Sequence, residues 1–367
     1  MTLTVPRVVC FVVLTAALSA QSQTPAVPRL RVDATWPPAL PNQWVLGSIS
    51  SVAVDDRDHV WMLHRPRTVP QAARTMAAPP VLEFDEKGRF VQAWGGPGQG
   101  YDWPDNEHGI YVDDRGTIWL GGNAGPGAAA VSEPWRDDDM LLNFTREGKF
   151  IRQFGQRAQS RGNADRANVR EPADLVLHRP TNELFVADGY GNRRVVVLDA
   201  NTLAFKRSWG AFGETPADVY PPPRTPQAPQ PLPAPDPAAV SDAAPRQFWI
   251  VHSLRVSNDG LVYVGDRQNR RVQVFGLDGA YRTQVMLSPQ NSLANAIALS
   301  PDREQRLLYV ADVPHTRIVF VDRRTLAVVG EFQADGLVPH HMAVDSRGNV
   351  FVAQLTNGAR KLAVVTD

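Results

Sequence analysis

The sequence predicts an all-β fold, a six-bladed β-propeller, and three observations support this prediction. The chain has 367 residues, more than a single hydrophobic core usually supports, so two domains or a repeat array are expected. Its 31 prolines and 27 glycines lie among many short Val, Ile, Leu, Phe and Tyr runs, which favours strands and turns over helices. A short pattern then recurs six times along the chain, which favours the repeat array.

Each copy of the repeat is an apolar alternating run, usually followed by Asp and a turn, and then a second run. This pattern is typical of a β-hairpin. A further pair of apolar runs follows most copies, so that each unit has four strands, as a propeller blade does. The copies are SVAVDDRDHVWMLHR from Ser51, GIYVDDRGTIWLGG from Gly109, DLVLHRPTNELFVADG from Asp174, SLRVSNDGLVYVGDR from Ser253, AIALSPDREQRLLYVAD from Ala296 and HMAVDSRGNVFVAQ from His341.

The two ends of the chain are expected to meet in the last blade. Only KLAVVTD follows the sixth copy, which leaves that blade one strand short. The segment RLRVDATW, from Arg29 to Trp36, is the natural supplier, and its pairing would close the ring and remove an exposed sheet edge. Residues 21–367 are therefore predicted to form one propeller domain. Within it, residues 216–245 hold eleven prolines and are predicted to be an exposed insertion loop.

The first twenty residues are typical of a secretory signal peptide. They carry Arg7 and no acid, then an apolar run from Val8 to Ala17. That run is too short to span a bilayer, and no later segment approaches about 20 apolar residues, so no membrane span is expected. Cys10 is the only cysteine and would leave with the peptide. We therefore expect a secreted or periplasmic protein without disulfides.

The charge balance bears on the partners of the protein. The 38 Lys and Arg residues equal the 38 Asp and Glu residues, so there is no electrostatic footprint for a polyanion. Nucleic-acid binding is therefore not expected. The chain is expected to act as a monomer on a small molecule or peptide.

Three of the eight histidines fall at one phase of the repeat. His108, His252 and His340 each stand four residues before the Val that ends the first run of units two, four and six. Alternate blades of a six-bladed ring present side chains about 120° apart beside the central channel. Three converging imidazoles are a ligand set of catalytic zinc, which keeps one position open for water or substrate. The alternative for each histidine is a turn residue satisfied by a backbone carbonyl. The same phase of the other units is held by Ser50, Ala173 and Asn295.

Three further candidates follow the second strands of their units, where strands end near one mouth of the channel. They are Arg65, Tyr190 and Arg267. Two guanidiniums and a phenol beside a metal could surround one small anion, since guanidinium binds carboxylate bidentately. A phenol becomes a base near neutral pH only where cations favour its ionised form. The alternatives are solvated rim arginines and a tyrosine packed on a neighbouring turn.

These residues carry a resemblance to a known family. The chain resembles the peptidylglycine α-amidating lyases, the lyase core of the bifunctional amidating enzyme, whose fold is a six-bladed propeller of NHL type. The likeness covers nearly all of the chain after residue 20. The histidine triplet with MLHR and DGYGN is its specific part, because many NHL repeats are binding scaffolds. It is densest in EHGIYVDDRGTIWL, PADLVLHRPTNELFVADGYGNRRVVVL, VHSLRVSNDGLVYVGDRQNRRVQVF and VPHHMAVDSRGNVFVAQ.

The resemblance implies a role for each candidate. It implies a zinc ion on the three phase-related histidines, a carboxylate-binding Arg65, a catalytic Tyr190 and a further active-site Arg267. It also implies a structural calcium held by the backbone carbonyls of Val52 and Ile110 and by an aspartate. His341 takes the place of that aspartate, and a neutral imidazole is a poor ligand for calcium, which argues against the ion. Either His341 replaces the calcium functionally or it brings the site a different metal.

The function implied is dealkylation of a carbinolamide. A peptidyl or N-acyl α-hydroxyglycine would be cleaved at its C–N bond to an amide and glyoxylate by a zinc lyase. The copper mono-oxygenase domain of the bifunctional enzyme is missing, so a separate enzyme would hydroxylate the substrate. Two alternatives remain open: a zinc hydrolase on the same propeller, and a non-catalytic NHL scaffold that binds peptides or glycans.

Overall fold

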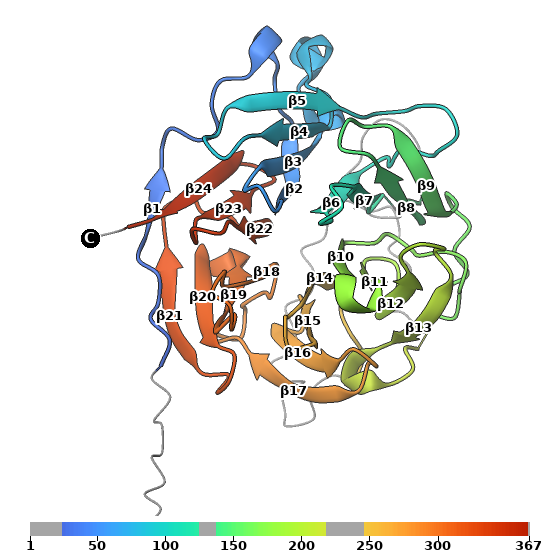
Figure 1. Ribbon diagram of the computed structural model, residues 1–367, viewed down its shortest axis with the longest axis vertical. Helices are drawn as coiled ribbons and strands as arrows, with labels where there is room; N and C mark the ends of the chain where they lie inside the picture. The colour runs from blue at the N-terminus through green and yellow to red at the C-terminus, as the bar shows by residue number, and fades with distance from the viewer. Residues whose placement is uncertain (1–23, 125–136, 218–245, 366–367) are drawn as a thin grey trace, which may run out of the picture.

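The predicted six-bladed propeller is confirmed. The computed structural model describes residues 24–124, 137–217 and 246–365, and these residues form six four-stranded antiparallel sheets around a common centre (Figure 1). The predicted signal peptide, residues 1–20, and almost all of the proline-rich insertion, residues 216–245, lie outside the described residues. Among the described residues, no helix has the length and apolar character needed to cross a membrane.

Each of the first five blades consists of strands that follow one another in chain order from the centre to the rim (Figure 1). The first three blades contain β2 (Ser48–Val54), β3 (Val60–Arg65), β4 (Val81–Phe84) and β5 (Phe90–Trp94); β6 (Glu107–Val112), β7 (Ile118–Gly122), β8 (Met140–Phe144) and β9 (Phe150–Gly155); and β10 (Asp174–His178), β11 (Glu183–Asp188), β12 (Arg194–Asp199) and β13 (Phe205–Trp209). The next two contain β14 (Val251–Val256), β15 (Leu261–Asp266), β16 (Arg271–Gly276) and β17 (Tyr281–Met286); and β18 (Ile297–Leu299), β19 (Leu307–Asp312), β20 (Arg317–Asp322) and β21 (Val328–Gln333).

The sixth blade takes strands from both ends of the chain. Its order is β1-β24-β23-β22, with β22 (His341–Val344), β23 (Val350–Ala353), β24 (Ala359–Val364) and β1 (Leu30–Asp33). β1 pairs antiparallel with β24, from Leu30 opposite Val364 to Asp33 opposite Lys361. The N-terminal strand thus lies at the rim, where it covers the outer edge of this blade (Figure 1).

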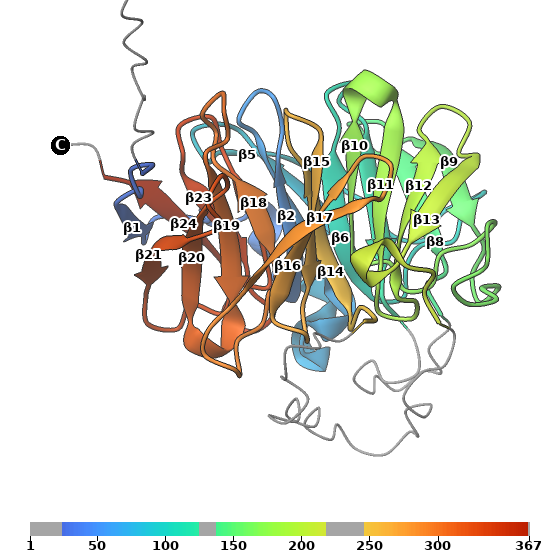
Figure 2. The ribbon, with the colours of Figure 1, turned by 90° about the horizontal axis from the view of Figure 1, so that it is seen from below.

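Within the described part of the chain, helical structure is confined to short 3₁₀ turns in the connections. Figure 2 shows the ring edge-on, with the strands running between its two faces and the turns at those faces. The 3₁₀ turns are η1 (Pro41–Gln43), η2 (Pro66–Thr68), η3 (Gln71–Met76), η4 (Arg179–Thr181), η5 (Ala211–Gly213) and η7 (Val313–His315).

The hydrophobic core is divided among the blade interfaces. Six clusters of buried residues fill the spaces between neighbouring sheets, one for each pair of blades around the ring. Trp36, for example, packs edge-on against Phe84 of the first blade and Phe351 of the sixth. Every sheet is therefore buried on both faces, which explains why the inner strands read as nearly continuous apolar runs.

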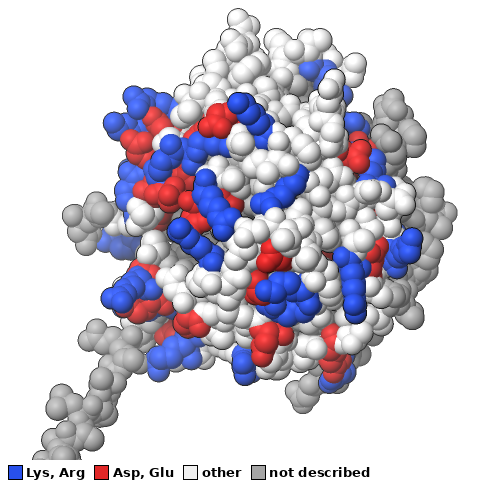
Figure 3. Space-filling model, turned by 45° about the vertical axis from the view of Figure 1, so that its right-hand side comes forward, with Lys and Arg blue, Asp and Glu red and all other residues white. Residues whose placement is uncertain are grey.

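Charges on the exterior are mixed. Figure 3 shows Lys and Arg side chains interspersed with Asp and Glu over the face drawn, with neither sign forming a continuous surface. This agrees with the formal charge of zero.

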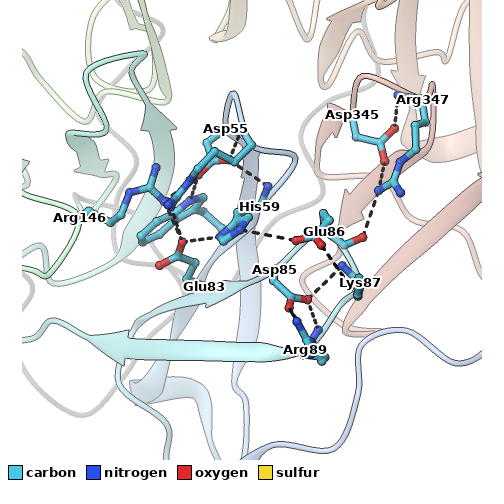
Figure 4. Close-up of polar contacts among 12 residues, drawn as sticks. Asp55, His59, Glu83, Asp85, Glu86, Lys87, Arg89, Arg146, Asp345 and Arg347 are labelled. Atoms are coloured by element: carbon cyan, nitrogen blue, oxygen red, sulfur yellow. Dashed lines mark hydrogen bonds and ion pairs between the residues drawn. The ribbon is translucent and has the colours of Figure 1, made fainter.

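An ion-pair network joins the first and second blades (Figure 4). Arg146, in the turn between β8 and β9, places Nη1 2.7 Å from Asp55 Oδ2 and 2.8 Å from Glu83 Oε1. His59 Nδ1 lies 2.7 Å from the same Glu83 oxygen. Asp55, His59 and Glu83 have the ligand types of a metal site, but the guanidinium already occupies the space between the two carboxylates. We therefore interpret this cluster as a structural ion pair.

Arg146→Ala is expected to lower the free energy of unfolding by about 3 kcal/mol, because it leaves the two buried carboxylates with only the half-exposed guanidinium of Arg57 as a permanent cation. Urea denaturation measures the change. Arg89→Ala is the matched control, since Arg89 is 71% exposed and its pair with Asp85 should contribute little. Equal effects of the two substitutions would contradict a structural role for the buried pair.

Candidate metal centre and active site

Four histidines converge at the centre of the ring. The imidazoles of His108, His252 and His340 have centroids 4.9 to 5.0 Å apart, although 232 residues separate the first from the last (340 − 108). His341 joins them, with its centroid 5.0 to 5.2 Å from each of the other three. All four side chains are buried, and one ligand nitrogen of each lies within 4.8 Å of those of the others.

Irregularities in the inner strands accompany this convergence. The register of β6 against β7 shifts between Glu107 and Ile110, next to His108. That of β14 against β15 shifts between Val251 and Ser253, on either side of His252. A β-bulge turns a side chain away from the regular alternation of the strand, and bulges are common beside active sites for this reason.

The three phase-related histidines are fixed by the blades between them. Their Nδ1 atoms donate to backbone carbonyls: His108 to Ala173 (2.8 Å), His252 to Asn295 (2.6 Å) and His340 to Ser50 (2.7 Å). A carbonyl can only accept, so Nδ1 carries the proton and Nε2 keeps a free lone pair. Ser50, Ala173 and Asn295 hold the same phase of the repeat in the other three blades. Each histidine therefore donates its Nδ1 hydrogen to a backbone carbonyl, as expected for a turn residue without a metal. Each ring nevertheless also faces the other two rings, as expected for a metal ligand.

The cluster is electrically neutral. Burial, reinforced by neighbouring histidines and arginines, lowers the pKa of His108, His252 and His340 well below the usual value. Burial likewise lowers the pKa of His341 to about 3. Neutral imidazole is the form that binds a metal.

Tyr190 lies directly on the histidine cluster. Its hydroxyl is 3.0 Å from His108 Nε2 and 3.1 Å from His252 Nε2, and it accepts a hydrogen bond from Arg267 Nη1 at 2.9 Å. With both histidines protonated at Nδ1, the hydroxyl donates to one Nε2 at a time. The guanidinium of Arg267 also stacks on the phenol ring, 5.3 Å from its centroid.

Two glycines allow this close approach. A Cβ at Gly189, before Tyr190, would lie 2.1 Å from the carbonyl oxygen of Val251, the residue before His252. A Cβ at Gly109 would lie 2.5 Å from the carbonyl oxygen of Ala173, which accepts from His108. Neither contact is possible for a larger residue without backbone movement.

Arg65 borders the same centre at the end of β3. Its Nε donates to the carbonyl of Glu107 at 2.8 Å and its Nη2 to Asn123 Oδ1 at 3.3 Å. Burial lowers the pKa of its guanidinium, and electrostatic attraction to Tyr190 and Glu107 opposes that shift, so the side chain stays protonated. Burial raises the pKa of the Glu107 carboxyl to about 7, so Glu107 is only partly ionised near neutral pH. Glu107 and Asn123 hold Arg65 in place, and the repeat pattern of the sequence did not predict this role for either residue.

The place of the implied calcium does not suit that ion. Val52 and Ile110 lie on the inner strands β2 and β6, but the group of potential ligands at the centre, over the described residues, comprises four imidazoles and no carboxylate. A guanidinium is also close to His341: Arg255 pairs with Asp174 at 2.7 Å, and its charge contributes to the low pKa of His341. Calcium requires oxygen ligands, and this group of side chains offers only nitrogens.

A transition metal fits the same residues better. Four neutral nitrogen donors suit zinc and related ions. The Nε2 of His341 is buried and has no hydrogen-bond partner within the described part of the chain. A tetrahedral ion with Zn–N bonds of about 2.0 to 2.1 Å would place imidazole centroids about 5.2 Å apart, close to the spacing found. The buried cluster could therefore hold a metal ion.

His64, next to Arg65, predicts a pH dependence of stability. It is buried, its Nδ1 accepts from the Gly47 amide (3.1 Å) and its Nε2 donates to the carbonyls of Ala78 and Pro79 (both 3.1 Å). Burial lowers its pKa to about 4. Between pH 6.5 and 4 the unfolded chain binds this proton and the folded chain does not, so stability falls as the pH falls, by up to about 3 kcal/mol.

Urea denaturation of wild type and His64→Gln across this pH range measures the contribution. The variant should lack that part of the slope, while His178→Gln, at the half-buried end of β10, should retain most of it. A slope unchanged in His64→Gln would contradict the assignment.

Comparisons with known proteins support the resemblance. No family model matches the chain. NHL repeat-containing protein 3 of Homo sapiens is 23% identical over 351 residues, which cover 90% of this chain and 82% of the human protein. A probable peptidyl-alpha-hydroxyglycine alpha-amidating lyase of Caenorhabditis elegans is 23% identical over 257 residues, covering 68% of this chain and 61% of that protein. Among solved structures, a streptogramin B lyase matches with a TM-score of 0.54 and 14% identity, over 92% of this chain and 98% of its own, and supports the fold alone.

Homologues of the chain thus include both NHL repeat-containing protein 3 and an amidating lyase, as the sequence predicted. NHL repeat-containing protein 3, whose name gives only its repeat, matches 90% of this chain. The amidating lyase, whose name gives an activity, matches 68%.

Proposed function

We propose that this homologue of the amidating lyase is a secreted, zinc-dependent lyase that cleaves the C–N bond of a peptidyl or N-acyl α-hydroxyglycine. The observation that carries the proposal is the position of the Tyr190 hydroxyl. It contacts Nε2 of His108 and His252 and a guanidinium hydrogen of Arg267, within a buried centre that Arg65 also borders. The Tyr190 oxygen, the Arg267 guanidinium and two of the histidines are thus in hydrogen-bond contact, and the charge of Arg65 acts on Tyr190.

Binding is assigned to the two arginines. The histidines are neutral, so the charge facing a substrate is that of Arg65 and Arg267. The partly ionised Glu107 competes only weakly for Arg65 near neutral pH. The carboxylate of an α-hydroxyglycine would bind Arg65, and this orients the adjacent hydroxyl toward the histidines.

Proton transfer is assigned to Tyr190. When bound, zinc supplies a Lewis acid that lowers the pKa of the α-hydroxyl. Tyr190 is assigned the role of the base: its oxygen, which accepts a hydrogen bond from Arg267, would take up the hydroxyl proton as the C–N bond breaks. The hydroxyl carbon becomes the aldehyde of glyoxylate, the electron pair of the broken bond goes to the amide nitrogen, and that nitrogen takes up a proton. Water is not consumed.

Glyoxylate release tests the proposal. The zinc-loaded protein is incubated with N-benzoyl-α-hydroxyglycine, and glyoxylate and benzamide are measured against a protein-free blank. Equal amounts of both products, formed faster than in the blank, are expected. No release above the blank would overturn the lyase assignment.

The hydrolase alternative differs in the fate of water. A zinc hydrolase would add water to an ester or lactone, so oxygen from labelled water would enter the product. The lyase reaction forms its products without incorporating water oxygen. Because glyoxylate exchanges its aldehyde oxygen with water, the amide and carboxylate products are the ones to analyse.

The scaffold alternative is favoured by one observation. NHL repeat-containing protein 3 matches 90% of this chain, more than the 68% matched by the lyase. A scaffold would use the metal only to clamp the blades and would bind a peptide or glycan over the loop face. Its partner would bind equally well to Tyr190→Phe, whereas an enzyme would lose turnover.

The proposed substrate requires a partner reaction. The α-hydroxyl group must be introduced by a separate oxidising enzyme. Residues 1–20 would direct the chain to the same extracytoplasmic space, where we propose that it acts as a monomer.

A further inference from the structure

We propose that His341 is a fourth, displaceable ligand of the metal, so that the resting site is closed by four imidazoles. The inference deepens the proposed function and rests on its metal site. A three-histidine zinc site leaves its fourth position to water or substrate. Here a fourth imidazole takes that position.

The spacing of the rings supports tetrahedral coordination. Four ligands at the corners of a tetrahedron have six equal separations. The six centroid distances among His108, His252, His340 and His341 all fall between 4.9 and 5.2 Å. If the ion lay in the plane of three of the rings with the fourth ring on the axis, the distances would instead fall into two different sets.

The hydrogen bonds separate His341 from the other three. His108, His252 and His340 are each anchored through Nδ1 to a carbonyl of the next blade. His341 Nε2 is buried without a hydrogen-bond partner over the described residues. A buried nitrogen in this state is destabilising unless another group satisfies it, and a metal ion at the centre of the cluster would do so.

This difference predicts which ligand moves. A substrate hydroxyl must either add as a fifth donor or take the place of one imidazole. The three anchored rings keep their orientation through their carbonyl partners, and such partners hold metal-bound histidines in place. His341 has no such anchor, so it is the ring that can leave. The carboxylate-binding arginine and Tyr190 then remain in place as the coordination changes.

X-ray absorption at the zinc edge tests the resting site. The zinc-loaded full chain is compared with His341→Gln and with the control His178→Gln, which changes a histidine at the end of β10 that contacts Thr181. Four imidazole nitrogens are expected for wild type and for the control, and three for His341→Gln. Competition with a zinc indicator should show zinc binding weakened about tenfold or more in His341→Gln only.

Adding N-benzoyl-α-hydroxyglycine to the zinc-loaded wild type tests the displacement. The spectrum is expected to lose one imidazole and gain one oxygen. Three imidazoles plus oxygen already in the resting wild type, unchanged in His341→Gln, would overturn the fourth-ligand inference and leave the lyase proposal intact. Four imidazoles retained alongside substrate oxygen would overturn the displacement of His341.

Failure of the wild type to bind zinc would overturn both the inference and the proposed function. If His341→Gln does not fold, the wild-type spectra decide alone.

Discussion

Tyr190→Phe is expected to lower kcat about 10²- to 10⁴-fold, the range for loss of a positioned acid–base group. The substitution removes only the hydroxyl that contacts His108, His252 and Arg267. The four imidazoles remain, so zinc content and its affinity should change little. KM should also change little, because Arg65 still binds the substrate carboxylate.

Steady-state glyoxylate release and zinc analysis of the same preparation measure this effect. Tyr111→Phe is the matched control, because it also removes a phenolic hydroxyl, one that donates to the carbonyl of Leu177 at 3.4 Å away from the histidine cluster. It should keep wild-type turnover. Full activity in Tyr190→Phe would show that another group moves the proton, and loss of zinc would show that Tyr190 acts through the metal site.

His252→Ala is expected to weaken metal binding more strongly than His341→Gln does, to abolish activity and to lower thermal stability. His252 is an anchored ligand, so its loss removes a donor that His341 cannot replace from its own position. A metal bound only to the folded state adds about 4 kcal/mol when the free ion is at 1,000 times its Kd. The variant loses this contribution in addition to the cost of the cavity that the imidazole leaves.

The melting temperature with and without a zinc chelator separates the contribution of the bound metal from the cost of the cavity. Wild type should lose stability on chelation, and His252→Ala should lose much less. Added calcium should leave the wild-type melting temperature unchanged, because the central ligands are imidazoles. His178→Ala is the control and should respond to chelation as the wild type does. A wild-type melting temperature that chelation leaves unchanged would count against a metal that joins the blades.

The difference between local and tertiary information is clear at His340 and His341. Successive residues of a strand point to opposite faces, so the repeat pattern assigns only one of two adjacent histidines to the centre. In the structure, β22 begins at His341, and both rings face the cluster. The first residue of β22 is set by its pairing with β23, and the sequence around the two histidines does not reveal that pairing.

The anchors of the histidines illustrate the same limit. Ser50, Ala173 and Asn295 occupy the phase of the repeat at which the other blades carry histidine, but their side chains give no sign of a function. It is their backbone carbonyls that accept from the imidazoles, and any residue except one that alters the backbone would supply the same oxygen. Only the angle between neighbouring blades reveals this pairing.

The sequence by itself determined the six-bladed fold and the convergence of His108, His252 and His340, because a repeated structural unit imposes rotational symmetry on residues of one phase. It also identified Tyr190 and Arg267 as neighbours of that centre. The tertiary structure alone decided that His341 joins the cluster, that backbone carbonyls fix the other three rings, and that Arg146 rather than a metal fills the Asp55–Glu83 cluster. These features depend on contacts between blades, and such contacts follow from the closed ring rather than from any one repeat.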